Sequence, residues 1–79
     1  MRKSVHSKPY RALLTQLVEA RKAAHLTQEE LAKKLKKPQS FVAKTETGER
    51  RLDVVEFVQI VKVLKADAGK LISVVVDAL

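Results

Sequence analysis

Two short helices joined by a tight turn are the feature that most constrains how this chain can fold. Thr27 is followed three residues later by Glu30, a spacing that forms a capping box, because each side chain satisfies a backbone N–H of the first turn. Pro38 suits the start of a helix but not its interior. Gly48 suits the left-handed conformation that closes a helix. The pattern therefore predicts a helix after Thr27, a break before Pro38 and a second helix over 39–47.

The second of these helices has two chemically different faces. At about 100° per residue, one side carries three residues expected to face the core: Val42, Thr45 and Glu46. The other side carries small residues or residues with an amide, a hydroxyl or an amine: Gln39, Ser40, Ala43, Lys44 and Thr47. Such groups can read base edges in a major groove, where amides pair with adenine and amines with guanine. The alternative is a solvated helix face, since polar residues usually point outward.

This segment resembles the helix-turn-helix of the Cro and Xre class of phage and bacterial repressors. The matching residues are TQEELA at 27–32, PQSFV at 38–42, Lys44, Glu46, and GERRLDV at 48–54. With the flanking helices, the resemblance covers the chain from about Tyr10 to Leu71. It implies an all-α, five-helix domain of the phage-repressor (lambda repressor-like) type that binds double-stranded DNA.

The resemblance also implies roles for individual side chains. Gln39 would touch a base edge, with Ser40, Lys44 and Thr47 beside it. Gln28, near the start of the preceding helix, would donate a hydrogen bond to a DNA phosphate.

Family members often pair an arginine of the first helix with the glutamate near the end of the recognition helix. Here these residues are Arg21 and Glu46. The pair would orient the helix without reading sequence; the alternative is an exposed ion pair of little energetic weight.

Two positions depart from the family pattern. Lys36 stands where the turn usually has glycine, and a left-handed lysine costs roughly 1 kcal/mol or somewhat more. We therefore expect either a reshaped turn or phosphate contacts by Lys36 and Lys37 that offset the strain. Thr45 stands where a larger apolar residue is common. A buried threonine can bond the carbonyl one turn back, but it fills less space, so we expect a slightly loose joint beneath the recognition helix.

The charge balance indicates a polyanionic partner. The 79 residues include 16 Lys and Arg against 9 Asp and Glu, a formal net charge of +7. Nucleic acid is the first candidate and an anionic membrane surface the second. We expect phosphate contacts from the basic turn and from the loop after the second helix, at Lys36, Lys37, Arg50 and Arg51.

The organisation expected from the sequence is a flexible basic arm over 1–8 and a single domain over 9–79. The arm would reach along DNA; the alternative is a frayed terminus without contacts. No apolar run reaches the roughly 18 to 20 residues of a membrane span, and no apolar signal core follows the basic start. We therefore expect a cytoplasmic bacterial or phage protein associated with the nucleoid, with no membrane partner.

The remaining helices are predicted from caps and apolar periodicity. The first runs from about Ser7 to Ala24, and the fourth starts at a capping box formed by Asp53 and Glu56. Phe57 is expected at the centre of the core. The apolar face of the fourth helix comprises Val54, Phe57, Val58, Ile60, Val61 and Leu64, with Val55 and Val63 outside it.

The last helix, capped by Asp67, is expected to run to about Leu79. Its inward residues are Leu71, Val74 and Ala78. The apolar residues left over form a predicted dimer contact: Ile72, Val75, Val76 and Leu79. Because β-branched residues form helices poorly, a short C-terminal strand is the alternative.

No catalytic or metal chemistry is expected. The chain has no cysteine, and its two histidines, His6 and His25, lie far apart without acidic neighbours. It shows no nucleophile–base pair and no glycine-rich phosphate loop, so we expect no enzyme, cofactor, metal or small-molecule ligand. The leading hypothesis is a homodimeric repressor or autoregulator that occupies its operator. The alternative is a protein-interaction partner, such as the antitoxin of a toxin–antitoxin pair.

Overall fold

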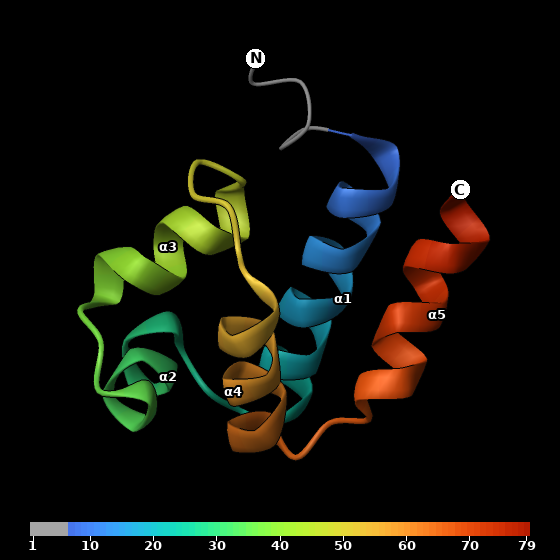
Figure 1. The fold of residues 1–79 in the computed structure, drawn as a ribbon. Coiled ribbons are helices and arrows are strands. Elements are labelled where there is room, and N and C mark those ends of the chain that lie inside the picture. The colour runs from blue at the N-terminus through green and yellow to red at the C-terminus, as the bar shows by residue number, and fades with distance from the viewer. Residues whose placement is uncertain (1–6) are drawn as a thin grey trace.

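Five α-helices joined by short links make up residues 7–79, the part of the chain that the computed structural model describes (Figure 1). Their bounds are α1 Lys8–Ala23, α2 Gln28–Leu35, α3 Gln39–Thr47, α4 Val54–Leu64 and α5 Ala68–Ala78. The predicted all-α fold is confirmed over these residues. The alternative of a C-terminal strand is wrong, because α5 is helical to Ala78.

Side-chain caps explain where most of the helices begin. Thr27 and Glu30 form the predicted capping box at α2, and Asp53 and Glu56 form the predicted one at α4. Asp67 caps α5 by accepting a backbone N–H. Each cap satisfies N–H groups that lack a partner within the helix, so the spacing of polar residues fixes these boundaries.

The start of α1 bears on the expected N-terminal arm. Ser7 Oγ accepts a hydrogen bond from the N–H of Tyr10 at 3.3 Å, and the helix begins at Lys8. Ser7 and Lys8 therefore belong to the domain. The rest of the expected arm, residues 1–6, lies outside the described residues. His6, for which no metal role is expected, is one of them.

Three helices are followed, within two residues, by a non-glycine residue in the left-handed conformation: His25 (φ 60°) after α1, Lys36 (φ 60°) after α2 and Lys65 (φ 55°) after α4. In each case the next residue donates its N–H to a carbonyl five residues back, at 3.0–3.2 Å, as in a Schellman motif. The turn before α3 is therefore not reshaped, because Lys36 adopts the conformation that glycine usually supplies.

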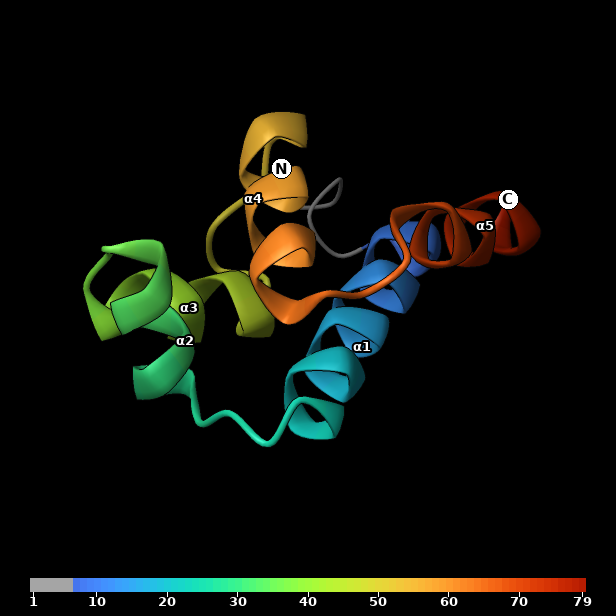
Figure 2. The ribbon, with the colours of Figure 1, turned by 90° about the horizontal axis from the view of Figure 1, so that it is seen from below.

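The core forms where α1 meets the other helices. Its buried residues are Leu13, Leu14, Leu17, Leu31, Ala32, Val42, Phe57, Ile60, Val61, Leu64 and Leu71. Phe57 is buried among them, as expected. In both views, α2 and α3 lie at one side of the molecule and α5 at the opposite side, along α1 (Figures 1 and 2). No helix within residues 7–79 is long and apolar enough to cross a membrane.

Two predictions about apolar faces are wrong. Val54 and Val58 of α4 are 77% and 50% exposed, whereas Val63 is partly buried against the core. The reason is that α5 packs along α1 and leaves this flank of α4 uncovered. Val75 of α5 packs against the core instead of joining the exposed set, because it follows buried Leu71 by one helical turn.

Candidate nucleic-acid interface

The recognition helix α3 presents the predicted base-reading side chains to the outside. Val42 and Thr45 are buried beneath it, which fixes the direction of its opposite face. That face carries four exposed residues: Gln39, Ser40, Lys44 and Thr47. Ala43, between them, is half-buried. Their roles in reading bases stay predictions.

A chain of hydrogen bonds runs from the first residue of α3 back to α1. Gln39 Nε2 donates to Gln28 Oε1 at 3.4 Å, and Gln28 Nε2 donates to Glu46 Oε1 at 2.8 Å. Arg21 then donates to both carboxylate oxygens of Glu46, from Nε at 2.7 Å and from Nη2 at 3.1 Å. Gln28, expected to donate to a phosphate, here links Gln39 to Glu46. Its phosphate contact stays a prediction.

The ion pair between Arg21 and Glu46 is present and largely enclosed. The two side chains are 11% and 10% exposed, so the alternative of an exposed pair does not describe it. Arg21 Nη1 also donates to the carbonyl of Leu26 at 2.8 Å, which ties the α1–α2 link to the same group. Glu46 therefore anchors α3 to α1 and α2 at once.

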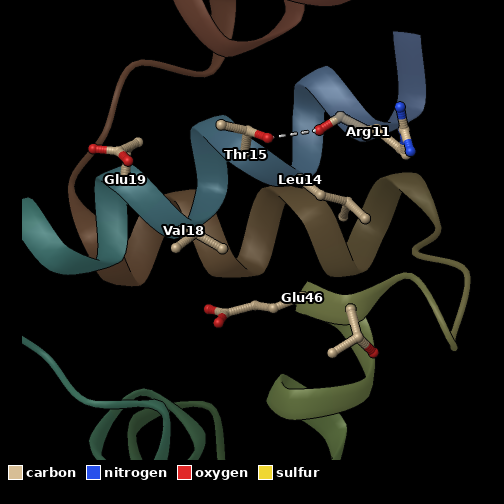
Figure 3. A pocket seen from close by; sticks show the side chains of 7 residues that line it. Arg11, Leu14, Thr15, Val18, Glu19 and Glu46 are labelled. Carbon is tan, nitrogen blue, oxygen red and sulfur yellow. Dashed lines mark hydrogen bonds between the residues drawn. The ribbon is translucent and has the colours of Figure 1, made fainter. Parts of the chain in front are cut away.

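Beside this ion pair, α1 and α3 leave an open groove of about 280 Å³ (Figure 3). Its lining residues are Arg11, Leu14, Thr15, Val18, Glu19, Glu46 and Thr47. Thr47 is thus placed at the edge of the exposed face of α3, next to α1.

The residues expected to bind phosphates fall into two groups. Lys36, Lys37 and Arg51 are exposed; the Arg51 guanidinium carbon lies 5.4 Å from the centre of the Tyr10 ring. Arg50 differs, because its Nη1 and Nη2 donate to the two oxygens of the same carboxylate, at 2.9 and 2.6 Å. Arg50 is therefore held against α4 through one edge of its guanidinium, and its phosphate contact stays a prediction.

The partner of Arg50 is Glu56, the residue that also completes the capping box of α4. The hydrogen bond from Arg50, and then the N–H of Asp53, lowers the pKa of Glu56 from 4.5 to about 2. The same hydrogen bond raises the pKa of Arg50. Sequence reasoning identified Glu56 as a cap but missed this second role, because no local pattern predicts an ion pair across the loop.

Sequence reasoning also assigned no role to Phe41. Its ring lies 4.5 Å from the guanidinium carbon of Arg50 and 5.4 Å from Nζ of Lys37. Cations are attracted to an aromatic face at such distances. Phe41 therefore connects the turn before α3 with the loop after it.

The joint beneath α3 contains a buried polar group without a partner. Thr45 is 3% exposed, and its hydroxyl makes no hydrogen bond. Thr45 therefore does not make the bond to the carbonyl one turn back that a buried threonine can make, although Thr15 makes such a bond to Arg11 at 3.0 Å. A cavity of about 10 Å³ adjoins Thr45 and is lined otherwise by Leu17, Leu31, Val42, Glu46 and Ile60. This supports the expected loose packing.

Comparison with known proteins agrees with the geometry. The helix-turn-helix family model matches residues 17–71. A solved structure described as an XRE-family like protein from Pseudomonas syringae is 48% identical, with a TM-score of 0.84 over 98% of this chain and 96% of that chain. No significant match was found among curated proteins.

The fold and the exposed face of α3 define the class: the protein is a helix-turn-helix, DNA-binding transcription regulator. Within that class, the chain belongs to the XRE family.

Proposed function

We propose that this regulator is a sequence-specific repressor or autoregulator that acts in the cytoplasm, at the nucleoid, by occupying its operator. The observation that carries the proposal is the anchored recognition helix. Gln39 is exposed at the start of α3, yet it is held by Gln28, which is held in turn by the Glu46–Arg21 pair. The bond from Gln39 is long and exposed, but the helix that carries Gln39 is anchored by the Glu46–Arg21 pair. A side chain presented from an anchored helix can discriminate base edges, because its position is set before DNA arrives.

Affinity and specificity come from different residues in this proposal. Lys36, Lys37 and Arg51 supply phosphate contacts, whose strength falls with salt. The readers of base edges are Gln39, Ser40, Lys44 and Thr47. Repression then needs no ligand-binding domain, since a protein seated on a promoter blocks access to it.

A homodimer is the second part of the proposal. The open groove between α4 and α5 has a volume of about 420 Å³ and an apolar lining that includes Leu52, Phe57, Val58 and Ile72. On the same helix as Ile72, Val76 and Leu79 project outward at 61% and 89% exposed. A surface that carries both a hollow and projecting side chains can pair with itself across a two-fold axis. The proposed dimer contact keeps three of the four residues predicted from the sequence: Ile72, Val76 and Leu79. It omits Val75, because Val75 packs against the core.

Selection of bound sequences from random double-stranded DNA at near-physiological salt tests both parts. We expect a pseudo-palindromic site whose half-sites are about 34 Å apart, one turn of DNA. Recovery of no preferred sequence would contradict a base-reading role for α3. An asymmetric single half-site would contradict the dimer.

The apolar groove also fits a different protein partner, as in an antitoxin. The mass of the purified chain in sedimentation equilibrium separates the two possibilities. We expect a dimer in the wild type and a monomer in Val76→Asp. A wild-type monomer that binds a second protein through this groove would favour the antitoxin alternative.

A further inference from the structure

The loop between α3 and α4 is attached to three helices. The N–H of Arg50 donates to the carbonyl of Lys44 at 3.1 Å, and the N–H of Leu52 donates to Tyr10 Oη at 2.8 Å. The Arg50 side chain adds its two bonds to Glu56 of α4. The loop is therefore fixed to α3, α1 and α4, although it carries the basic residues expected to meet DNA.

The turn on the other side of α3 is joined to the same cluster through Phe41. The ring of Phe41 is half-buried against the core and lies close to both Lys37 and Arg50. The carboxylate of Glu56, with a pKa of about 2, stays charged at neutral pH. One aromatic ring, one guanidinium and one carboxylate thus connect the α2–α3 turn, α3 and α4.

The chemistry of Arg50 decides what this cluster does. An arginine binds a phosphate well when it offers two parallel N–H groups, as it does to a carboxylate. Both of the Arg50 η nitrogens already bond Glu56, whose charge also offsets that of Arg50. Nη1 also donates to the carbonyl of Arg51 at 3.1 Å, which leaves a phosphate only the Nε edge of the guanidinium. Because Arg50 is held by a carboxylate that also caps α4, it is better placed as a support than as a clamp.

We infer that Phe41, Arg50 and Glu56 are positioning residues, which set where the basic turn and the basic loop meet the DNA backbone relative to α3. The inference rests on the proposed sequence-specific DNA binding. It assigns specificity to residues that do not touch bases, because phosphate contacts fix the register in which a recognition helix enters the groove.

The test compares substitutions of two acidic residues of the same region, Glu56 and Glu49, that should affect sequence discrimination differently. Glu56→Gln and Glu49→Gln each remove one negative charge, which by itself strengthens binding to any DNA. Glu49 is exposed and lies one residue before Arg50, so we expect its variant to bind the selected site and random DNA at least as tightly as wild type. We expect Glu56→Gln to lower the ratio of site affinity to random-DNA affinity by roughly 3- to 20-fold.

A charge-neutral variant covers the case in which Glu56→Gln folds poorly. Phe41→Leu keeps an apolar side chain but removes the ring face, and we expect it to lower the same ratio. Phe41→Tyr keeps the ring and should restore it. Folding is checked by thermal melting, and affinities are measured well below the midpoint.

The outcomes are distinguishable from failure of the proposed function. If wild type shows no sequence preference, the proposed function fails before the variants are compared. If wild type discriminates and Glu56→Gln strengthens binding to both DNAs as Glu49→Gln does, the positioning role is overturned. Full discrimination in Phe41→Leu would overturn the part assigned to Phe41.

Discussion

Arg21 Nε donates to Glu46 Oε2 at 2.7 Å and so joins α1 to the recognition helix across 25 residues of sequence. Because both side chains are largely enclosed, water can replace neither partner fully. Removing one partner of such a pair leaves an uncompensated charge, which costs more than the intact pair contributes. The pair therefore orients α3 relative to α1, and the loss of either partner should lower the stability of the fold.

We expect Arg21→Met to lower the free energy of unfolding by about 3 kcal/mol, because Glu46 is left without its cation. Urea denaturation measures this difference. Lys22→Met is the matched control, since Lys22 is exposed on the same helix and should change stability by no more than about 0.5 kcal/mol. The double variant Arg21→Met, Glu46→Leu should recover part of the loss. Equal small effects at Arg21 and Lys22 would contradict the role of the pair.

Replacing Gln39 by alanine should cost about 1–3 kcal/mol of binding to the selected site and little on random DNA. Gln28→Ala should weaken discrimination at the same base position, because Gln28 holds the Gln39 amide. The two losses should not add, since they remove one connected arrangement. Fluorescence anisotropy with matched duplexes measures each term. Gln59→Ala, exposed on α4, is the control; equal losses on both DNAs would show that Gln39 is not a reader.

Thr45→Val should stabilise the protein by about 1 kcal/mol, because it removes a buried hydroxyl that has no partner without changing side-chain shape. Thermal and urea unfolding both report the gain. Thr15→Val makes the same chemical change at an exposed hydroxyl that has a partner, so it should bring no gain. A loss of stability in Thr45→Val would indicate that an ordered water satisfies the hydroxyl.

Helix boundaries and most buried faces were predictable because their signals are local. A cap and its acid three residues later, as at Thr27 and Glu30, interact within one turn. The burial of Val42 and Thr45 followed from helical spacing alone. The exposed set on α3 follows from the same spacing.

Features that depend on how helices pack were not predictable. Val54 and Val58 lie on an apolar stripe, but only the placement of α5 along α1 decides that they stay exposed. Arg50 was predicted to be a phosphate ligand because arginine forks match phosphate oxygens. Its partner Glu56 lies across a loop, and only the folded loop brings them together.

Replacing each of two lysines in the left-handed conformation by glycine should distinguish an effect on stability from an effect on DNA affinity. Lys36→Gly and Lys65→Gly each remove left-handed strain, so each should stabilise the protein by roughly 0.5–1 kcal/mol. Lys36 lies in the turn before the recognition helix, whereas Lys65 ends α4. We expect Lys36→Gly to reduce affinity for random DNA and to lower the slope of log affinity against log salt by about 1. Lys65→Gly should leave both unchanged; an equal slope change in both would indicate a non-local charge effect.

The ion pair of Glu56 predicts a specific dependence of stability on pH. Its pKa is lowered from 4.5 to about 2 in the folded protein, so the folded state binds its proton more weakly than the unfolded state. The stabilisation is therefore complete above about pH 5 and is lost as pH falls towards 2. Glu56 contributes through a capping box and a partly exposed ion pair, which together are worth roughly 1–2 kcal/mol.

Urea unfolding at pH 7 and pH 3 of wild type and Glu56→Gln isolates this contribution. Wild type should be the more stable at pH 7. The difference between the two proteins should shrink at pH 3, because unfolded wild type then binds a proton at Glu56 that the folded state binds only weakly, whereas Glu56→Gln has no such proton. Glu49→Gln serves as the control and should follow the wild-type decline, since Glu49 is exposed. If the difference between wild type and Glu56→Gln were the same at both pH values, the charge on Glu56 would not stabilise the fold. The ion pair between Arg50 and Glu56 would then make no net contribution to the free energy of unfolding.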